Sequence, residues 1–145
     1  MKQILKAIGV AMLTLGFFGS LGNVSAHAAS SKTTTPKAIR GTWYRYAGNN
    51  KFDKIKITTH TVTFNDKKYK PSYKGYRKLA VSKWGSWYLL NKSSSTKKSL
   101  GQFKATKTLI KGKYKKTLVR SYGVGSYQVF TTNKYKHKLT YNALG

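Results

Sequence analysis

Apolar and polar residues alternate with a period of two over most of the chain after Ala38. In the stretch DKIKIT, Ile55 and Ile57 share one face and the lysines between them share the other. Val62 and Phe64 alternate with threonines in the same way. This alternation is typical of half-buried β-strands, and the abundance of Thr, Tyr, Val and Ile favours the same structure.

Turn signals rich in Gly, Asn and Asp divide this pattern into short segments. Strands are expected near residues 39–47, 53–59, 61–65, 67–72, 76–82, 86–91, 99–104, 107–111, 116–122, 126–132 and 135–141. Nothing after Pro36 keeps a helical period for more than a turn or two. Short antiparallel strands bury their apolar faces in a barrel or a sandwich, and a barrel also removes exposed strand edges. We therefore expect an all-β fold, a small antiparallel β-barrel, with a sandwich as the alternative.

A short motif of glycine followed by Ser or Thr and an aromatic residue recurs in the chain. It begins at Gly41 (GTWY) and Gly85 (GSWY), with a looser copy, GSYQ, at Gly125. The sequence between the copies does not match, which argues against a true internal repeat. The favoured interpretation is local: the glycine opens a strand where the backbone is crowded, and the ring behind it packs over the gap.

The N-terminal segment has the order of features found in signal peptides. Two early lysines precede an apolar run from Ala7 to Phe18, and Ala26-His27-Ala28 resembles a cleavage site. We expect a signal peptide at 1–28, with an uncleaved anchor as the alternative, then a disordered leader at 29–37 and a single barrel domain at 38–145. The sequence has no cysteine, which fits a bacterial exported protein better than a disulfide-bonded eukaryotic domain.

The charge balance changes the picture most. Lys2 and Lys6 precede Ala28, so 27 of the 29 basic residues remain against Asp53 and Asp66, a net charge of +25. Such a field attracts polyanions. Most of these cations are lysines, which attract phosphate as point charges but do not select a particular arrangement of its oxygens. Lysine-rich stretches interleaved with tyrosines supply the candidate polyanion-binding residues, namely Lys67, Lys68, Lys70, Lys74, Arg77, Lys78, Lys111, Lys113, Lys115, Lys116, Lys134, Lys136 and Lys138.

Four tyrosines in these stretches are candidate stacking platforms for sugar or base rings: Tyr69, Tyr73, Tyr76 and Tyr114. The alternative, that they fill the core while the lysines are solvated, stays open at this point.

The side chains suited to catalysis are few. Acid–base chemistry usually needs carboxylates or histidines, and the chain after Ala28 offers Asp53, Asp66, His60 and His137. The aspartates lie at expected turns or strand starts, His60 at a turn, and His137 on an apolar face where a core position is expected. We expect no enzymatic activity, no cofactor and no metal site.

The stretch AIRGTWYRY resembles the first strand of the lipocalin and calycin barrels, whose shared signature is Gly-x-Trp. The resemblance implies structural roles for Gly41 and Trp43, with Arg120 in a late strand packing on the indole ring. The chain from this motif to its Tyr-rich end also resembles small exported proteins of lactic-acid bacteria.

Together these observations predict a secreted, non-enzymatic protein that associates with anionic cell-envelope polymers such as teichoic acid at the surface of a Gram-positive bacterium. Nucleic acid would be bound only non-specifically, and no transmembrane segment is expected after the signal peptide. A lipocalin-like carrier of a small molecule is the alternative. A cationic effector acting on membranes would need an exposed apolar face, which the pattern does not show.

Overall fold

The computed structural model describes residues 32–93, 95, 97–123 and 125–141. The expected signal peptide at 1–28 and the first residues of the leader lie outside the described residues. The strands are β2 (Gly41–Gly48), β3 (Lys51–Ile57), β4 (Val62–Phe64), β5 (Lys67–Tyr69), β6 (Ser82–Trp84), β7 (Trp87–Leu89), β8 (Gln102–Ile110), β9 (Lys113–Ser121) and β10 (Tyr127–Thr131). Two short 3-10 helices, η2 (Lys37–Ile39) and η3 (Gly75–Arg77), complete the described elements.

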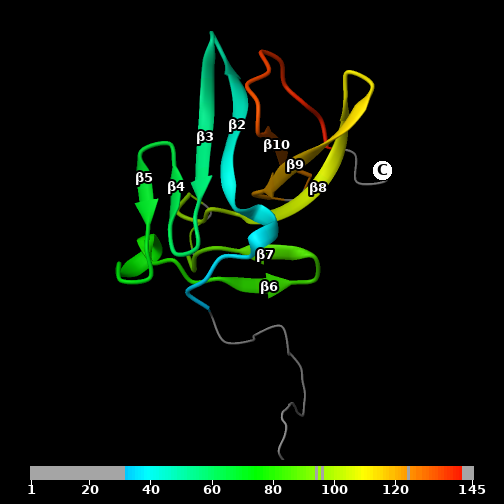
Figure 1. Cartoon of the computed structure of the whole chain (residues 1–145). Helices are drawn as coiled ribbons and strands as arrows, with labels where there is room; N and C mark the ends of the chain where they lie inside the picture. Colours follow the sequence, from blue (N-terminus) through cyan, green and yellow to red (C-terminus); the bar gives the residue numbers. More distant parts are fainter. Residues whose placement is uncertain (1–31, 94, 96, 124, 142–145) are drawn as a thin grey trace, which may run out of the picture.

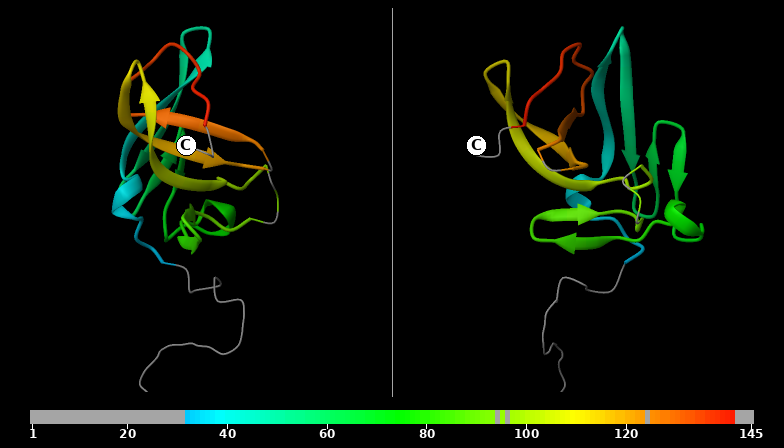
Figure 2. Two further views of the ribbon diagram at one scale, coloured as in Figure 1. Left: turned by 90° about the vertical axis from the view of Figure 1, so that its right-hand side faces the viewer. Right: turned by 180° about the vertical axis from the view of Figure 1, so that it is seen from behind.

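All nine strands belong to one antiparallel sheet, in the order β5-β4-β3-β2-β10-β9-β8-β7-β6. The sheet curls into a half-barrel (Figure 1), so the prediction of a small all-β antiparallel barrel is confirmed. Every neighbouring pair is also consecutive in sequence except β2 and β10, which join through Tyr44 and Thr131. The β6–β7 hairpin runs crosswise beneath the long hairpins (Figure 2), and the chain between β5 and β6 links the two ends of the sheet.

The backbone conformation of the turns agrees with the residue types found there. The β8–β9 turn has two central residues, Lys111 and Gly112, with φ of 51° and 77°, as a type I′ hairpin requires. The strands expected separately at 99–104 and 107–111 are one strand, β8, because its ladder with β9 is unbroken. In place of the strand expected at 76–82, η3 is followed by a loop and the three-residue β6.

The prediction of a strand at 135–141 is wrong, because this segment pairs with no strand of the sheet. It lies over the sheet through its side chains instead. The Tyr135 ring packs under the Lys111 ammonium at 5.7 Å, and Tyr141 contacts Tyr127 with ring centroids 5.0 Å apart. The alternation of half-buried rings and exposed lysines therefore arises from a segment laid on a surface. His137, expected in the core, is exposed.

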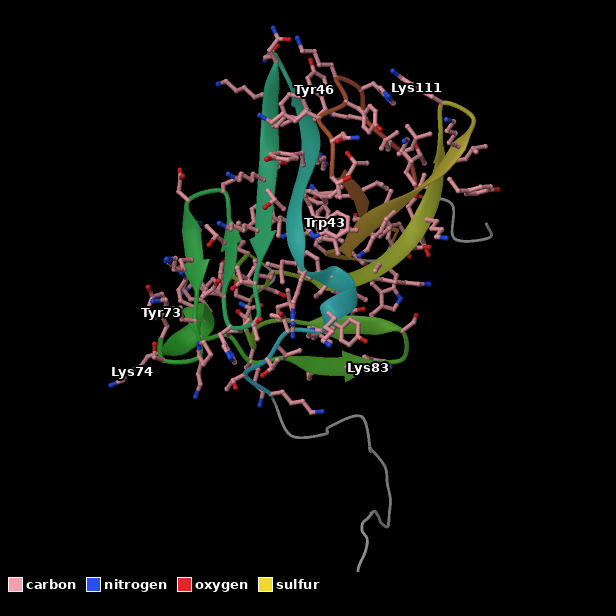
Figure 3. All side chains as sticks on the ribbon, in the orientation of Figure 1. Trp43, Tyr46, Tyr73, Lys74, Lys83 and Lys111 are labelled. Atoms are coloured by element: carbon pink, nitrogen blue, oxygen red, sulfur yellow. The ribbon has the colours of Figure 1, made fainter. Side chains whose placement is uncertain are left out.

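The core fills the concave side of the sheet. Trp43, Phe103 and Phe130 are its largest members, each no more than 1% exposed. Trp43 points into the space that the sheet encloses (Figure 3), and its indole N–H donates to the Ile39 carbonyl at 2.9 Å. Phe64 of β4 packs edge-on against Phe130 of β10, which links the two halves of the half-barrel.

Part of the segment expected to be a disordered leader belongs to the fold. Lys32 forms a backbone bridge with Val81. Thr35 is buried, and its hydroxyl donates to the Thr58 carbonyl at 2.6 Å. The domain thus begins before residue 38.

The three copies of the glycine motif have different roles. At Gly41 the Trp43 indole packs over the glycine as expected, since a Cβ added there would lie 3.8 Å from its nitrogen. That is an ordinary contact distance, so the positive φ of +133°, and not the expected crowding, favours glycine at this copy. Gly85 and Gly125 also have positive φ, but a Cβ on either would meet nothing within 4 Å, so they serve turns. The rings that follow them, Trp87 and Tyr127, stack on each other with centroids 6.2 Å apart.

No helix among the described residues has the length and apolar character needed to cross a membrane.

Candidate anion-binding site

The candidate polyanion-binding residues form two groups at different places on the sheet. One, the β5–η3 corner, contains Lys67, Lys68, Lys70, Lys74, Arg77 and Lys78. The other, the hairpin end, contains Lys111, Lys113, Lys115 and Lys116 of the β8–β9 hairpin with Lys134, Lys136 and Lys138 of the following segment. Lys74 and Lys111 mark these two groups in Figure 3, and Lys83 of β6 stands at a third corner. All of these side chains are exposed except Lys70, Arg77 and Lys115, which are partly buried.

Side-chain contacts bring the hairpin end together from distant parts of the sequence. The Lys111 ammonium lies over Tyr135, and the Lys134 ammonium lies 5.1 Å from the Tyr44 ring and 5.6 Å from the Phe52 ring. These cation–π contacts hold the charged ends of two lysines over aromatic rings, while both side chains stay exposed to solvent. The 134–138 lysines and the hairpin lysines therefore present one basic surface.

The four candidate platform tyrosines differ in how far they are exposed to solvent. Tyr73 is 36% exposed and Tyr114 is 73% exposed, so both can meet a ligand. Tyr69 is 4% exposed, and burial raises its pKa. It pairs with the buried Val62 on the core side of the β4–β5 ladder, so its assignment as an exposed platform is wrong. Tyr76 is half-buried against the core, with the Lys98 ammonium 5.3 Å from its ring.

A hollow of about 530 Å³ opens beside the β5–η3 corner, a size within the range of small-molecule sites. It is lined by Phe64, Asn65, Asp66, Lys67, Tyr69, Tyr76, Lys97, Lys98, Ser99, Leu100 and Arg120. Sequence reasoning missed Lys97 and Lys98, because they follow a serine-rich stretch that reads as an ordinary solvated loop. Their pairing as adjacent cations was the one signal that could have indicated them.

Arg120 does not pack on Trp43, as the lipocalin resemblance implied. Thr131 pairs with both Tyr44 and Thr117, so the register brings position 116 level with Trp43. The Lys116 ammonium accordingly lies over the indole at 5.7 Å. Four residues along a strand span about 13 Å, which places Arg120 too far away.

Arg120 instead lines the hollow. Its Nε donates to the Leu100 carbonyl at 2.6 Å and its Nη1 to the Gln128 amide oxygen at 2.9 Å. The guanidinium lies 4.8 Å from the Phe64 ring centroid and 4.9 Å from that of Tyr122. Burial lowers the pKa of this guanidinium from its ordinary value, because burial penalises the charged form.

Asn91 fixes the two sides of the hollow relative to each other. This buried amide donates to the carbonyls of Tyr76 at 2.8 Å and Lys98 at 3.0 Å, and its oxygen accepts from the Leu100 N–H at 2.9 Å. The η3 side and the loop bearing Lys98 are therefore joined by one fully bonded side chain.

The acidic residues and histidines do not gather into a reactive cluster in the described chain. Asp53 pairs with Arg45 and accepts a hydrogen bond from Asn65, while Asp66 is exposed. His60 and His137 are exposed on separate segments. Among the described residues, no group of three or more His, Asp or Glu side chains is placed to hold a metal ion.

The chain matches no protein-family model, no curated protein and no solved structure.

Proposed function

We propose that this protein is a secreted, non-enzymatic cationic protein that associates electrostatically with anionic polymers of the Gram-positive cell envelope, such as teichoic acid. The observation that carries the proposal is that its surface cations lack carboxylate partners. Arg45 with Asp53 is the one ion pair among the described residues. Nearly all the remaining cations therefore present uncompensated charge to a partner.

The distribution of these cations favours a polymer over a single small anion. The β5–η3 corner, the hairpin end and Lys83 lie at separate corners of the domain (Figure 3). A chain that carries a phosphate in each repeat unit can contact several such places at once, and each contact releases counterions. Lysine supplies this attraction without a fixed fork geometry, which suits a partner without a defined sequence.

The alternative of a lipocalin-like carrier has no comparable support. Trp43, Phe103 and Phe130 occupy the concave side of the sheet, where an apolar ligand would have to lie.

The test measures binding of the protein to isolated Gram-positive cell walls over a series of salt concentrations. The logarithm of the binding constant should fall linearly with the logarithm of salt concentration, with a slope that grows with the number of phosphates contacted. Extraction of the phosphodiester polymers from the walls should abolish most of the binding. Binding that persists in strong salt, or that survives this extraction, would refute the proposal.

A matched pair of variants sharpens this test. Lys113→Gln with Lys136→Gln removes two exposed charges from the hairpin end and should reduce the salt slope by about one to two units. Thr132→Gln with Thr140→Gln changes two exposed neutral residues in the same region and should leave the slope unchanged.

A further inference from the structure

Arg120 is a partly buried cation that forms no ion pair within the described part of the chain, although Asp53 lies within electrostatic reach of it. Its Nε and Nη1 are bonded to neutral acceptors, and its Nη2 has no hydrogen-bond acceptor among the described residues. The rings of Phe64 and Tyr122 lie against the guanidinium. Partial burial of a cation that has no paired carboxylate costs free energy, so this position favours an anion that approaches from the hollow.

Three further cations converge on the same hollow from two other segments. Lys67 comes from β5, and Lys97 and Lys98 come from the loop that follows β7. Asp66 is the one acidic residue in the lining, so positive charge dominates. The Asn91 hydrogen bonds described above hold the backbone of Lys98 and Leu100, so a buried side chain fixes the position of this part of the lining.

The hollow also has aromatic and hydroxyl groups that a bare anion would not need. Phe64, Tyr69 and Tyr76 line it; the Tyr69 ring is buried, so the half-buried rings of Phe64 and Tyr76 are the ones that a ligand can meet. The Tyr69 hydroxyl makes no hydrogen bond to the described residues. Rings of this kind pack against the faces of sugars, while hydroxyl and carboxylate groups bond to sugar hydroxyls. Low-dielectric walls also strengthen attraction between the guanidinium and a bound anion.

From these features we propose that the hollow binds one phosphate ester unit on a sugar, with the Arg120 guanidinium as its central donor. The planar guanidinium matches the geometry of phosphate oxygens, and Lys67, Lys97 and Lys98 balance the remaining charge. The Tyr76 ring contacts the sugar that carries the phosphate. This inference rests on the proposed function, because it identifies the place where one repeat unit of the polymer is held most specifically.

The test follows the side-chain Nε–H resonance of Arg120 by NMR while glucose 1-phosphate is added to the protein. The resonance should shift and saturate, with inorganic phosphate binding more weakly and glucose producing no shift. Lys97→Gln with Lys98→Gln should weaken binding about tenfold, as expected for loss of charge-assisted contacts. The matched variant Lys113→Gln with Lys136→Gln removes the same charge elsewhere and should weaken it by less than about threefold, because distant exposed charges are screened.

Three results would overturn the inference: an unmoved Arg120 resonance, an equal response to glucose alone, or equal weakening in the two lysine variants. Arg120→Lys is a second variant, which keeps the positive charge and loses the planar guanidinium, so it should bind glucose 1-phosphate more weakly. Its thermal unfolding is measured in parallel to show that it is folded. Wall binding by the same proteins separates the two proposals. Salt-dependent wall binding without any response at Arg120 leaves the proposed function standing and removes the hollow as its site. A saturating response at Arg120 without wall binding would support a sugar phosphate site in the hollow and would refute the proposal that the protein binds the wall polymer.

Discussion

Replacement of Trp43 by alanine tests whether this residue supports the fold or contacts a ligand. Its side chain is 1% exposed and donates a hydrogen bond to the buried Ile39 carbonyl. Deletion of a buried tryptophan costs about 3–5 kcal/mol, and the stranded carbonyl adds about 1 kcal/mol or more. Small domains have about 5–15 kcal/mol of stability in total, so Trp43→Ala should remove about a third of it or more.

Urea unfolding followed by far-ultraviolet circular dichroism measures this loss. With the slopes usual for small proteins, the midpoint should fall by about 2 M. Trp84→Ala is the matched control, because Trp84 is 59% exposed and faces Trp87 across the β6–β7 hairpin. It should cost less than about 1 kcal/mol. A Trp43→Ala protein with a normal midpoint and lost wall binding would show that the tryptophan is a contact residue and that the packing argument is mistaken.

Three further outcomes follow from individual side chains. At fixed ionic strength, the melting temperature should change little between about pH 7 and pH 4, because Asp53 and Asp66 are the only acidic side chains in the chain and both described histidines are exposed. Burial raises the pKa of Tyr69 above its ordinary 10.0. The contribution of this group to stability is therefore present below about pH 10 and is lost as pH rises through the folded pKa. In a titration followed by phenolate absorbance, the tyrosine whose pKa is raised should be present in the unmodified protein and absent from Tyr69→Phe. Asn91→Ala leaves three bonded backbone groups without their partner and should cost about 3 kcal/mol in urea unfolding, whereas Asn133→Ala, at an exposed position, should cost less than about 0.5 kcal/mol.

Local patterns predicted the parts of the fold that depend on neighbouring residues. Ile55, Ile57 and Val62 are buried as their alternation requires, because side-chain direction in a strand has a period of two whatever the tertiary fold. The same alternation led to the wrong prediction of a strand between Tyr135 and Tyr141. A segment lying on a surface buries every second ring without joining a ladder, and nothing local distinguishes the two cases.

Features that depend on register could not be read from the sequence. The β2–β10 pairing joins residues far apart in the chain, and together with the β10–β9 register it decides that Lys116 rather than Arg120 lies over Trp43. The hollow likewise forms from four separate segments, including the loop with Lys97 and Lys98 and the strand that carries Arg120. Composition predicted a basic surface, but charge counting carries no information about which cations meet.

Positive charge has two opposing effects in this protein, and salt separates them. Lys107 lies directly opposite Lys116 in the β8–β9 ladder, and like charges facing each other destabilise a sheet. Salt screens such repulsion within a Debye length of about 10 Å at 0.1 M, so added salt should raise the melting temperature of the unbound protein while it weakens wall binding. Lys107→Glu creates an opposite-charge pair and should raise the melting temperature most at low salt, by the equivalent of about 0.2–1 kcal/mol. Lys113→Glu makes the same charge change opposite Ile110, where no lysine faces it, and should have a smaller effect. Equal stabilisation by both variants would mean that total charge, and not the facing lysine pair, limits the stability of the hairpin.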